Sequence, residues 1–203
     1  MYRGNFSQIS ATVAWFDFYT SGAVKNPAVS TLHIDKFIEN DIPELWAYYC
    51  VSEDRDKLSN RFIAMPSFRN RILGTQMYKY NIKGFLHWGF NFYNSRYSVK
   101  PIDPYQETCG EYFTPAGDCF LVYPAQDGTA YSSLHCQQFY MALEDHKAMM
   151  LCESLVGREK TLAAVEEGTE SFTGYGIIVY SATGLLSKLK SMSSFVSLTM
   201  SPV

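Results

Sequence analysis

The apolar and polar positions of this chain alternate in short runs that predict strands and helices in turn. Residues 11–19 are rich in β-branched and aromatic side chains, and residues 45–50 form a second run of this kind. Runs of this length and composition, bounded by Gly, Asn, Pro and Ser, are typical of strands. We therefore expect two short strands in the first quarter of the chain.

Helix signals separate these runs. Ser30 or Thr31 is expected to cap a short helix. A longer helix is predicted to open at Ser67 and to close at Gly84, with larger side chains at four-residue steps and lysines near its end. An aromatic strand over residues 85–90 follows directly. This order of strand, loop, helix and strand is the unit of a parallel sheet.

The second half of the chain has a different pattern. Residues 94–115 hold three prolines, a glycine and scattered aromatic residues, and predict a long excursion, which in a compact domain is usually functional. Residues 118–123 predict another short strand. The longest helix is expected over residues 134–156, capped by Ser132 or Ser133, and its dense apolar positions predict that it packs on a sheet.

Charged residues gather in the segment 52–61, which is expected to be a solvated loop. Three arginines surround the start of the helix that follows, and we expect them to brace this loop by ion pairs. The arginines are Arg61, Arg69 and Arg71, and their expected partners are Glu53, Asp54 and Asp56.

Composition excludes several functional classes. The net charge is −3 with no basic run, so binding to nucleic acid phosphates is not expected. No apolar run approaches the roughly 20 residues of a membrane helix, and residues 1–8 lack the apolar centre of a signal peptide. Five widely spread cysteines are an odd number, which predicts reduced thiols and a cytoplasmic setting.

The end of the chain departs from the rest. No acidic residue follows Glu170, and eight serines fall between Ser171 and Ser201. The chain is therefore divided into a domain over residues 1–170 and an atypical Ser-rich tail over residues 171–203. The tail has two interpretations: it is a loosely ordered terminus, or its reading frame is altered.

The sequence shows none of the common motifs that bind a metal ion or an organic cofactor. The four histidines show no His-x-x-x-His spacing and the cysteines no Cys-x-x-Cys spacing, so no metal site is expected. A Gly-x-Ser-x-Gly elbow, a phosphate-binding loop and a dinucleotide fingerprint are also missing from the sequence. No metal or organic cofactor is therefore expected.

Aromatic and amide side chains near the ends of two predicted strands form a candidate ligand site. Trp46 and Tyr48 lie two residues apart and so share one face of their strand, and Trp88 lies on the next strand, with Gly89 permitting a bulge that re-aims Asn91. Indole and phenol faces stack on the apolar face of a sugar ring, although both tryptophans could equally be core. The candidate substrate-binding residues are Trp46, Tyr48, Tyr49, His87, Trp88, Asn91 and Tyr93.

Six stretches in a fixed order carry a resemblance to a known family. They are Leu-Trp-Ala-Tyr-Tyr-Cys (45–50), Asn-Arg-Phe-Ile-Ala-Met-Pro (60–66), Arg-Asn-Arg-Ile-Leu-Gly (69–74), Gly-Phe-Leu-His-Trp-Gly-Phe-Asn (84–91), Ala-Gly-Asp-Cys-Phe-Leu-Val-Tyr-Pro (116–124) and Ala-Leu-Glu-Asp (142–145). Together they resemble the C-terminal half of the glycoside hydrolase family 123 catalytic domain, also described as DUF4091, over residues 16–167.

The resemblance implies an α/β fold, a partial (β/α)8 TIM-type barrel that supplies about the last four β/α units, with a further strand near Val29. It implies a β-N-acetylgalactosaminidase-like enzyme that acts on β-linked N-acetylhexosaminides by a substrate-assisted retaining mechanism, an exception to the usual two-carboxylate scheme. Carbohydrate is then the expected partner. Unpaired sheet edges of a partial barrel would favour self-association.

The same resemblance shows what this sequence lacks. In the family an adjacent Asp-Glu pair at the end of an earlier strand orients the acetamido group and protonates the leaving oxygen. The neighbouring acids here are Glu53-Asp54 in the charged loop and Glu144-Asp145 in the long helix. Neither pair lies at a strand end, so no catalytic residue is assigned. The alternative is a non-catalytic carbohydrate-binding or structural fragment.

Overall fold

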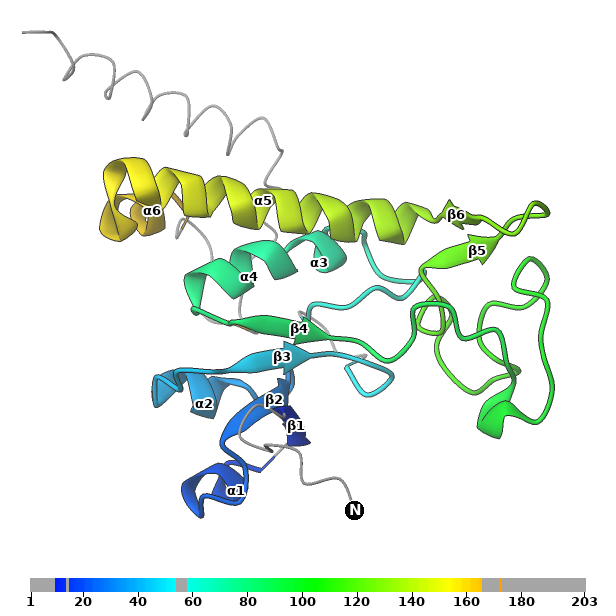
Figure 1. The fold of residues 1–203 in the computed structure, drawn as a ribbon, viewed down its shortest axis with the longest axis horizontal. Helices are drawn as coiled ribbons and strands as arrows, with labels where there is room; N and C mark the ends of the chain where they lie inside the picture. The colour runs from blue at the N-terminus through cyan, green and yellow to red at the C-terminus, as the bar shows by residue number, and fades with distance from the viewer. Residues whose placement is uncertain (1–9, 14, 54–57, 166–171, 173–203) are drawn as a thin grey trace, which may run out of the picture.

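A four-stranded parallel sheet is the centre of the structure (Figure 1). This computed structural model describes residues 10–13, 15–53, 58–165 and 172. The strands lie side by side in chain order: β1 (Ser10–Val13), β2 (Asn26–Ser30), β3 (Trp46–Tyr48) and β4 (Gly84–Leu86). Helices alternate with these strands, which confirms the α/β class and the predicted parallel order.

Helices form two layers on one side of this sheet. The helices are α1 (Asp17–Thr20), α2 (Asp35–Glu39), α3 (Phe68–Arg71), α4 (Leu73–Lys79), α5 (Leu134–Val156) and α6 (Arg158–Val165). Figure 1 shows α5 stretched across α3 and α4, which separate it from the sheet. Even α5, at 23 residues, is not apolar enough to cross a membrane, and neither is any other helix in the described part of the chain.

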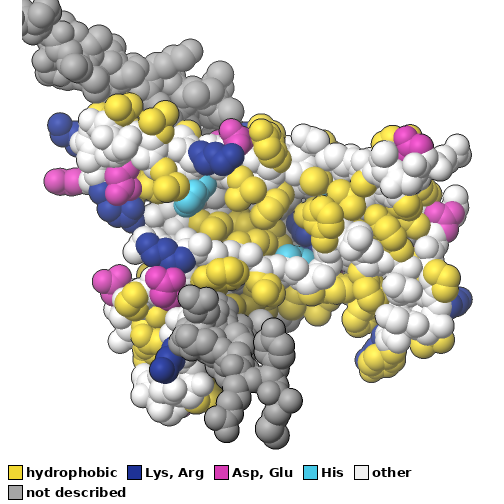
Figure 2. All heavy atoms as spheres, in the orientation of Figure 1, with side chains coloured by type: hydrophobic (Ala, Val, Ile, Leu, Met, Phe, Trp, Pro, Cys, Tyr) yellow, Lys and Arg dark blue, Asp and Glu magenta, His cyan; other side chains and the backbone are white. Residues whose placement is uncertain are grey.

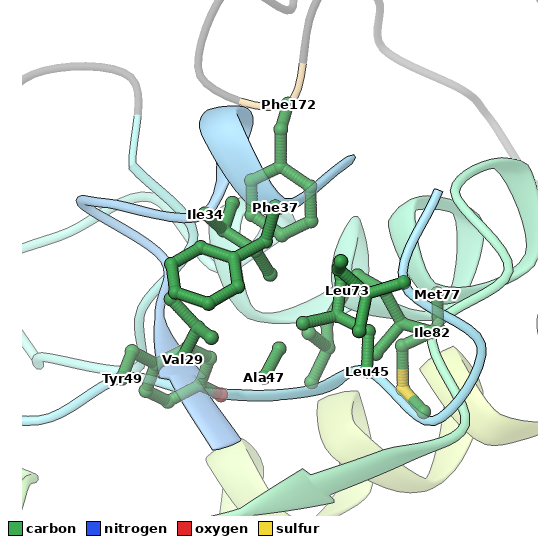
Figure 3. Packing of buried hydrophobic residues seen from close by; sticks show 11 residues of the cluster. Val29, Ile34, Phe37, Leu45, Ala47, Tyr49, Leu73, Met77, Ile82 and Phe172 are labelled. Atoms are coloured by element: carbon green, nitrogen blue, oxygen red, sulfur yellow. The ribbon is translucent and has the colours of Figure 1, made fainter. Parts of the chain in front are cut away.

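The main core lies between the sheet and helices α2 and α4 (Figure 3). Val29 and Ala47 point from adjacent strands toward Phe37 of α2 and Leu73 of α4, and all four are buried. Phe172 also belongs to this core, and its carbonyl accepts a hydrogen bond of 2.8 Å from Gln76 Nε2. Except for Phe172, the predicted tail over residues 171–203 lies outside the described residues.

The predicted N-terminal strands are longer than the observed ones. The strand expected over residues 11–19 ends at Val13 and is followed by α1, because Phe16 and Tyr19 turn back to pack on Phe37. The expected strands over residues 45–50 and 85–90 are β3 and β4, each of three residues. A strand near Val29 is confirmed as β2.

Two helix predictions are wrong in detail. Ser30 and Thr31 do not cap a helix, since Ser30 ends β2 and the N-cap of α2 is Ile34. The single helix expected after Ser67 is two short helices, α3 and α4, and Gly84 begins β4 rather than ending the helix. The chain leaves α4 through Asn81, whose φ of 54° is in the left-handed region.

The second half of the chain matches its prediction more closely. Residues 94–115 form the expected long excursion, with only a 3-10 turn, η2 (Arg96–Ser98). The strand expected over residues 118–123 is β5 (Val122–Pro124), which forms a hairpin with the unpredicted β6 (Ala130–Ser132). Helix α5 begins and ends where predicted, and Ser133 Oγ caps it by accepting a hydrogen bond from the Cys136 amide.

The packing of α5 differs from the prediction. It was expected to lie on a sheet because its apolar positions are dense, but it packs chiefly on α3 and α4. Its apolar residues are spread over both faces, so several large ones are exposed. These are Leu134, Tyr140, Met150, Leu151 and Leu155.

The charged loop after β3 is not simply solvated. Glu53 and Arg61 are both buried, and Glu53 bonds Ser30, Cys50 and Ser52 rather than an arginine. The other two expected partners, Asp54 and Asp56, lie outside the described residues. Arg61 donates to backbone carbonyls, and Arg71 forms a two-point ion pair with Asp145 of α5, with distances of 2.7 and 2.9 Å. Each of these arginine contacts joins segments far apart in sequence, which a local pattern of charges does not reveal.

Gly74 sets the close approach of α4 to α5. A Cβ atom added at this position would lie 1.9 Å from the carbonyl oxygen of Ala142, so only glycine fits there. We expect Gly74→Ala to destabilise the protein by about 1–3 kcal/mol through overpacking, although the same change on an open helix face gains about 1 kcal/mol. Chemical denaturation of the two proteins measures the difference.

The matched control for this change is Ala142→Gly. It does not relieve the clash, because the obstructing atom at Ala142 belongs to the backbone. The double variant should therefore be no more stable than Gly74→Ala alone. A Gly74→Ala protein that is more stable than the wild type would contradict the close approach of the two helices.

Candidate functional site

The carboxyl ends of the strands meet along one edge of the sheet, next to the long excursion (Figure 1). Ser30, Tyr48 and Leu86 end β2, β3 and β4 on this edge. Parallel strands place their carboxyl ends together, and ligands of open α/β sheets bind outside those ends. We therefore expect the functional site at this edge.

Asp118 is the buried centre of the edge. Its carboxylate has no exposed surface, and its two oxygens are used by neighbouring residues just after β4. Trp88 donates its indole N–H to Oδ2 over 2.8 Å, and His87 Nε2 lies 3.1 Å from Oδ1. The sequence reaches this arrangement because residues 90–92 pair with residues 119–121 in antiparallel fashion.

The hydrogen bonds of His87 fix where its proton lies. The Gly89 amide donates to Nδ1 over 3.0 Å, so Nδ1 is an acceptor and the proton of the neutral ring is on Nε2, where it points to Asp118. Burial lowers the pKa of His87, and the nearby Arg61 charge acts in the same direction, although Asp118 opposes both. His87 is therefore a neutral donor in the folded chain.

Arg61 places a second buried charge at the same point. Its Nη2 donates to the carbonyl of Asp118 over 2.6 Å and also to the carbonyl of Gly89. Burial lowers the pKa of Arg61, while Tyr49 and Asp118 oppose that shift. A buried cation next to a buried carboxylate leaves the cluster close to neutral, which limits the cost of burying either charge.

Gly89 permits this close packing. A Cβ atom at this position would lie 2.4 Å from the carbonyl oxygen of Asp118 and 2.8 Å from that of Cys119. The sequence predicted a bulge at Gly89. In the structure this position requires glycine for a different reason, because the backbone of Asp118 and Cys119 approaches it closely.

Glu53 anchors the loop after β3 on the same edge. Its carboxylate accepts hydrogen bonds from the hydroxyl of Ser30, from the Cys50 amide over 2.8 Å and from Ser52 Oγ over 2.9 Å. Burial raises the pKa of Tyr48, with the charge of Glu53 acting in the same direction. Glu53 is thus a structural acid that ties the end of β2 to the turn after β3.

An aromatic cluster covers the outer side of Asp118. The ring of Trp88 lies 5.2 Å from that of Phe92 and 5.8 Å from that of Phe113, both near edge-to-face, and 39% of the Trp88 side chain remains exposed. On the face drawn in Figure 2, apolar side chains gather over the lobe formed by the excursion and the β5–β6 hairpin. The edge therefore presents ring surface to solvent above a buried polar base.

A hollow lies between the segments 62–69 and 115–116. It has a volume of about 410 Å³, and its lining includes Phe62 and Ala116, which are close in the chain to Arg61 and Asp118. A larger hollow of about 510 Å³ lies at the other end of β4, where Lys83 and Tyr78 line it. Its polar groups Tyr78, Glu153 and Arg158 bond one another, and it is remote from Trp88.

The structure places Tyr48, His87 and Trp88 at this edge, whereas Trp46 begins β3 at the amino end of the strands. Trp46 and Tyr48 share the face of the sheet that is turned away from α2 and α4, as their spacing predicts, and both are half-buried. The Trp46 ring covers Gly84, where an added Cβ atom would lie 2.4 Å from the indole. His87 and Trp88 meet at Asp118.

The other predicted residues have different positions. Tyr49 belongs to the core, where its hydroxyl donates to Asn70 over 2.9 Å. Tyr93 donates its hydroxyl to the carbonyl of Val122 over 2.7 Å. Asn91 is exposed and forms a bridge with Phe120.

Sequence reasoning did not assign Asp118 or Arg61 to the site. Asp118 lies at the start of an apolar run that was interpreted only as a strand, and Arg61 lies in a charged run that was interpreted as a loop. A lone acid at the start of an apolar run was the one available signal. No group of three or more His, Cys, Asp or Glu residues that could hold a metal ion occurs among the residues described.

The lowered pKa of His87 predicts a pH dependence of stability. Burial also lowers the pKa values of His135 and His146 below the ordinary value of 6.5. As the pH falls through that value, the unfolded chain binds protons that the folded chain does not, so the free energy of unfolding decreases. We expect denaturation midpoints to fall between pH about 7.5 and about 5.5.

The variant His87→Gln separates the contribution of His87 to this pH dependence from those of His135 and His146. The groups that face His87 are Asp118, Arg61 and Glu53, and none of them is altered by this change. The variant should show a smaller fall in stability over the same interval, since the lowered pKa of His87 then no longer contributes. An unchanged pH slope would contradict a neutral, buried His87.

Comparisons with known proteins agree with this geometry. The family model for the glycoside hydrolase 123 catalytic domain matches residues 4–152. A solved structure of a family 123 glycoside hydrolase from Clostridium perfringens, described in connection with glycolipid glycan hydrolysis, superposes with a TM-score of 0.61 at 17% sequence identity. The match covers 95% of this chain but 37% of the other.

No curated protein sequence matches the chain. The family model nevertheless spans most of its length, and the solved structure shares its fold. The chain therefore belongs to the glycoside hydrolase 123 catalytic-domain family.

Proposed function

We propose that this chain is part of a glycosidase for β-linked N-acetylhexosaminides and supplies a sugar-binding wall of its active site. The observation that carries the proposal is the position of Trp88. Its indole is anchored by Asp118 at the carboxyl edge of a parallel sheet while 39% of the side chain stays exposed. A fixed, exposed aromatic face is suited to stacking on the apolar side of a pyranose.

We further propose that the sheet is a segment of a (β/α)8 barrel wall. All four strands run in parallel, and helices α2 and α4 pack on the same face. In a barrel the helices are outside, so the opposite face, which carries Trp46 and Tyr48, would point inward. Active sites of such barrels lie at the carboxyl ends of the strands, where Trp88 is found.

The described acids of this edge are already engaged. Asp118 accepts from His87 and Trp88, and Glu53 accepts from Ser30, Cys50 and Ser52. A general acid needs a proton within reach of the leaving oxygen. We therefore propose that the family's Asp-Glu pair is supplied by a part of the domain that this chain does not contain.

In that arrangement the two parts have separate tasks. The acetamido oxygen of the substrate attacks the anomeric carbon, the Asp of the pair orients the acetamide, and the Glu protonates the leaving oxygen. In our proposal the present chain holds and orients the sugar through Trp88, with Tyr48 and Asn91 as polar neighbours, whereas His87 acts only through its bond to Asp118. A glycan carried by a glycolipid is a reasonable substrate class to test, given the description of the Clostridium enzyme.

A non-catalytic carbohydrate-binding role is the second candidate. It is favoured by one observation, which is that the buried carboxylates of this edge, Asp118 and Glu53, have their oxygens bound by protein donors. The two candidates predict the same sugar contacts and no turnover by this chain alone. They differ in the longer protein: hydrolysis of an aryl N-acetyl-β-galactosaminide once the part carrying the Asp-Glu pair is supplied favours the glycosidase, its absence favours the binding role, and hydrolysis by this chain alone would overturn both.

Replacement of Trp88 tests the sugar-binding wall. We expect Trp88→Ala to weaken binding of methyl N-acetyl-β-galactosaminide by about tenfold, because the stacking surface is lost. Titration followed by NMR measures the affinity. The control is Tyr140→Ala, which removes a similarly exposed ring from the outer side of α5. Equal affinities of wild type and Trp88→Ala would refute the proposed wall.

The outer strands of the sheet predict self-association. In the described sheet β1 and β4 each pair with one neighbour, so each has a free edge. We expect the purified chain to form dimers, or to precipitate, as its concentration rises. Gel filtration with light scattering measures this, and a compact monomer at every concentration would argue against an open barrel segment.

A further inference from the structure

The Asp118 carboxylate orients two aromatic side chains at once. Its two oxygens receive N–H groups from two consecutive aromatic residues, His87 and Trp88, which come from a segment 30 residues earlier in the chain. The imidazole and indole planes lie within 20° of each other, with centroids 6.2 Å apart. One carboxylate thus fixes two rings in nearly the same orientation.

The hydrogen bonds around this carboxylate form a closed set. The Gly89 amide occupies His87 Nδ1, so His87 can donate to Asp118 only from Nε2. Arg61 bonds the carbonyls of Gly89 and Asp118 and so holds the two segments together. Because Trp88 is the donor to Oδ2 of Asp118, rotating its ring would leave that buried oxygen without a donor, which is costly.

The indole of Trp88 is restricted from the other side as well. Phe92 and Phe113 lie against it near edge-to-face, so they flank the ring without covering all of it. A ring that is held before the ligand arrives loses less rotational freedom on binding, and this raises affinity. An unanchored surface tryptophan would have to be ordered by the ligand itself.

We propose that Asp118 is a positioning residue for sugar binding: it holds Trp88 in the orientation in which its face stacks on the sugar. This inference rests on the proposed sugar-binding wall.

The first test does not depend on any sugar. In the full chain, the indole N–H resonance of Trp88, identified by its loss in Trp88→Phe, should be protected from solvent exchange and shifted by its bond to a carboxylate. Asp118→Asn should abolish that shift, and the ¹⁵N spectrum of His87 should show the Nε2–H form only in the wild type. A rapidly exchanging Trp88 N–H in the wild type would overturn the inference.

The second test asks whether Asp118 acts through Trp88. Asp118→Asn should weaken binding of methyl N-acetyl-β-galactosaminide about tenfold, and it should have no further effect when Trp88 is already alanine. A matched control is Asp145→Asn, which removes a carboxylate that also accepts two hydrogen bonds, but on α5. An equal effect of Asp118→Asn in both backgrounds would show that it acts only on the fold.

A third variant covers the case in which Asp118→Asn does not fold. Trp88→Phe removes the donor and keeps an aromatic ring at an exposed position, so it should lower affinity less than Trp88→Ala but more than the Asp145→Asn control.

If the Trp88 N–H is protected and yet Trp88→Ala binds the sugar as well as wild type, the sugar-binding wall fails while the hydrogen bond stands. If Trp88→Ala weakens binding and Trp88→Phe does not, the wall stands and the positioning role fails.

Discussion

A carboxylate that is removed from water has to be paired, and at Asp118 this requirement joins three parts of the chain. The donors to its side chain come from His87 and Trp88, and the compensating cation is Arg61. Loss of any one partner would leave a buried charge or polar group uncompensated, at a cost of several kcal/mol for a buried ion pair. The excursion after β4 therefore cannot separate from the edge of the sheet without exposing this cluster.

The same requirement explains why the edge is rigid on both sides. Glu53 ties the turn after β3 to the end of β2, as Asp118 ties the segment after β4 to the loop that carries Arg61. Two buried acids are thus used as anchors on one sheet edge. An edge built in this way offers fixed ring surfaces, and it leaves proton transfer to groups outside the clusters. This is the physical basis for our proposal that the chain binds sugar and that the acid chemistry belongs to other residues.

The elements that the sequence predicted well are those whose signals are local. The bounds of helix α5 and a cap at Ser132 or Ser133 were predicted because capping and apolar spacing depend on a few neighbouring residues, and the structure shows Ser133 as the cap. The parallel order followed from alternating strands and helices. The burial of Glu53 and Arg61 could not be found in this way. Arg61 donates to the carbonyls of Gly89 and Asp118, which lie 28 and 57 residues further along the chain, and Glu53 accepts from Ser30, 23 residues earlier, so the local composition was that of an ordinary solvated loop.

The predicted site residues show the same division between local and distant causes. Sequence spacing placed Trp46 and Trp88 near one edge but left open whether each belonged to the core or to a site. The structure separates them, since the Trp46 ring covers Gly84 whereas Trp88 has its N–H on a buried acid and is itself 39% exposed. For an amphipathic ring these two roles are compatible, because the polar tip can be buried while the face remains free. What the sequence could not predict is the direction of that face, which is determined by an aspartate 30 residues further along the chain.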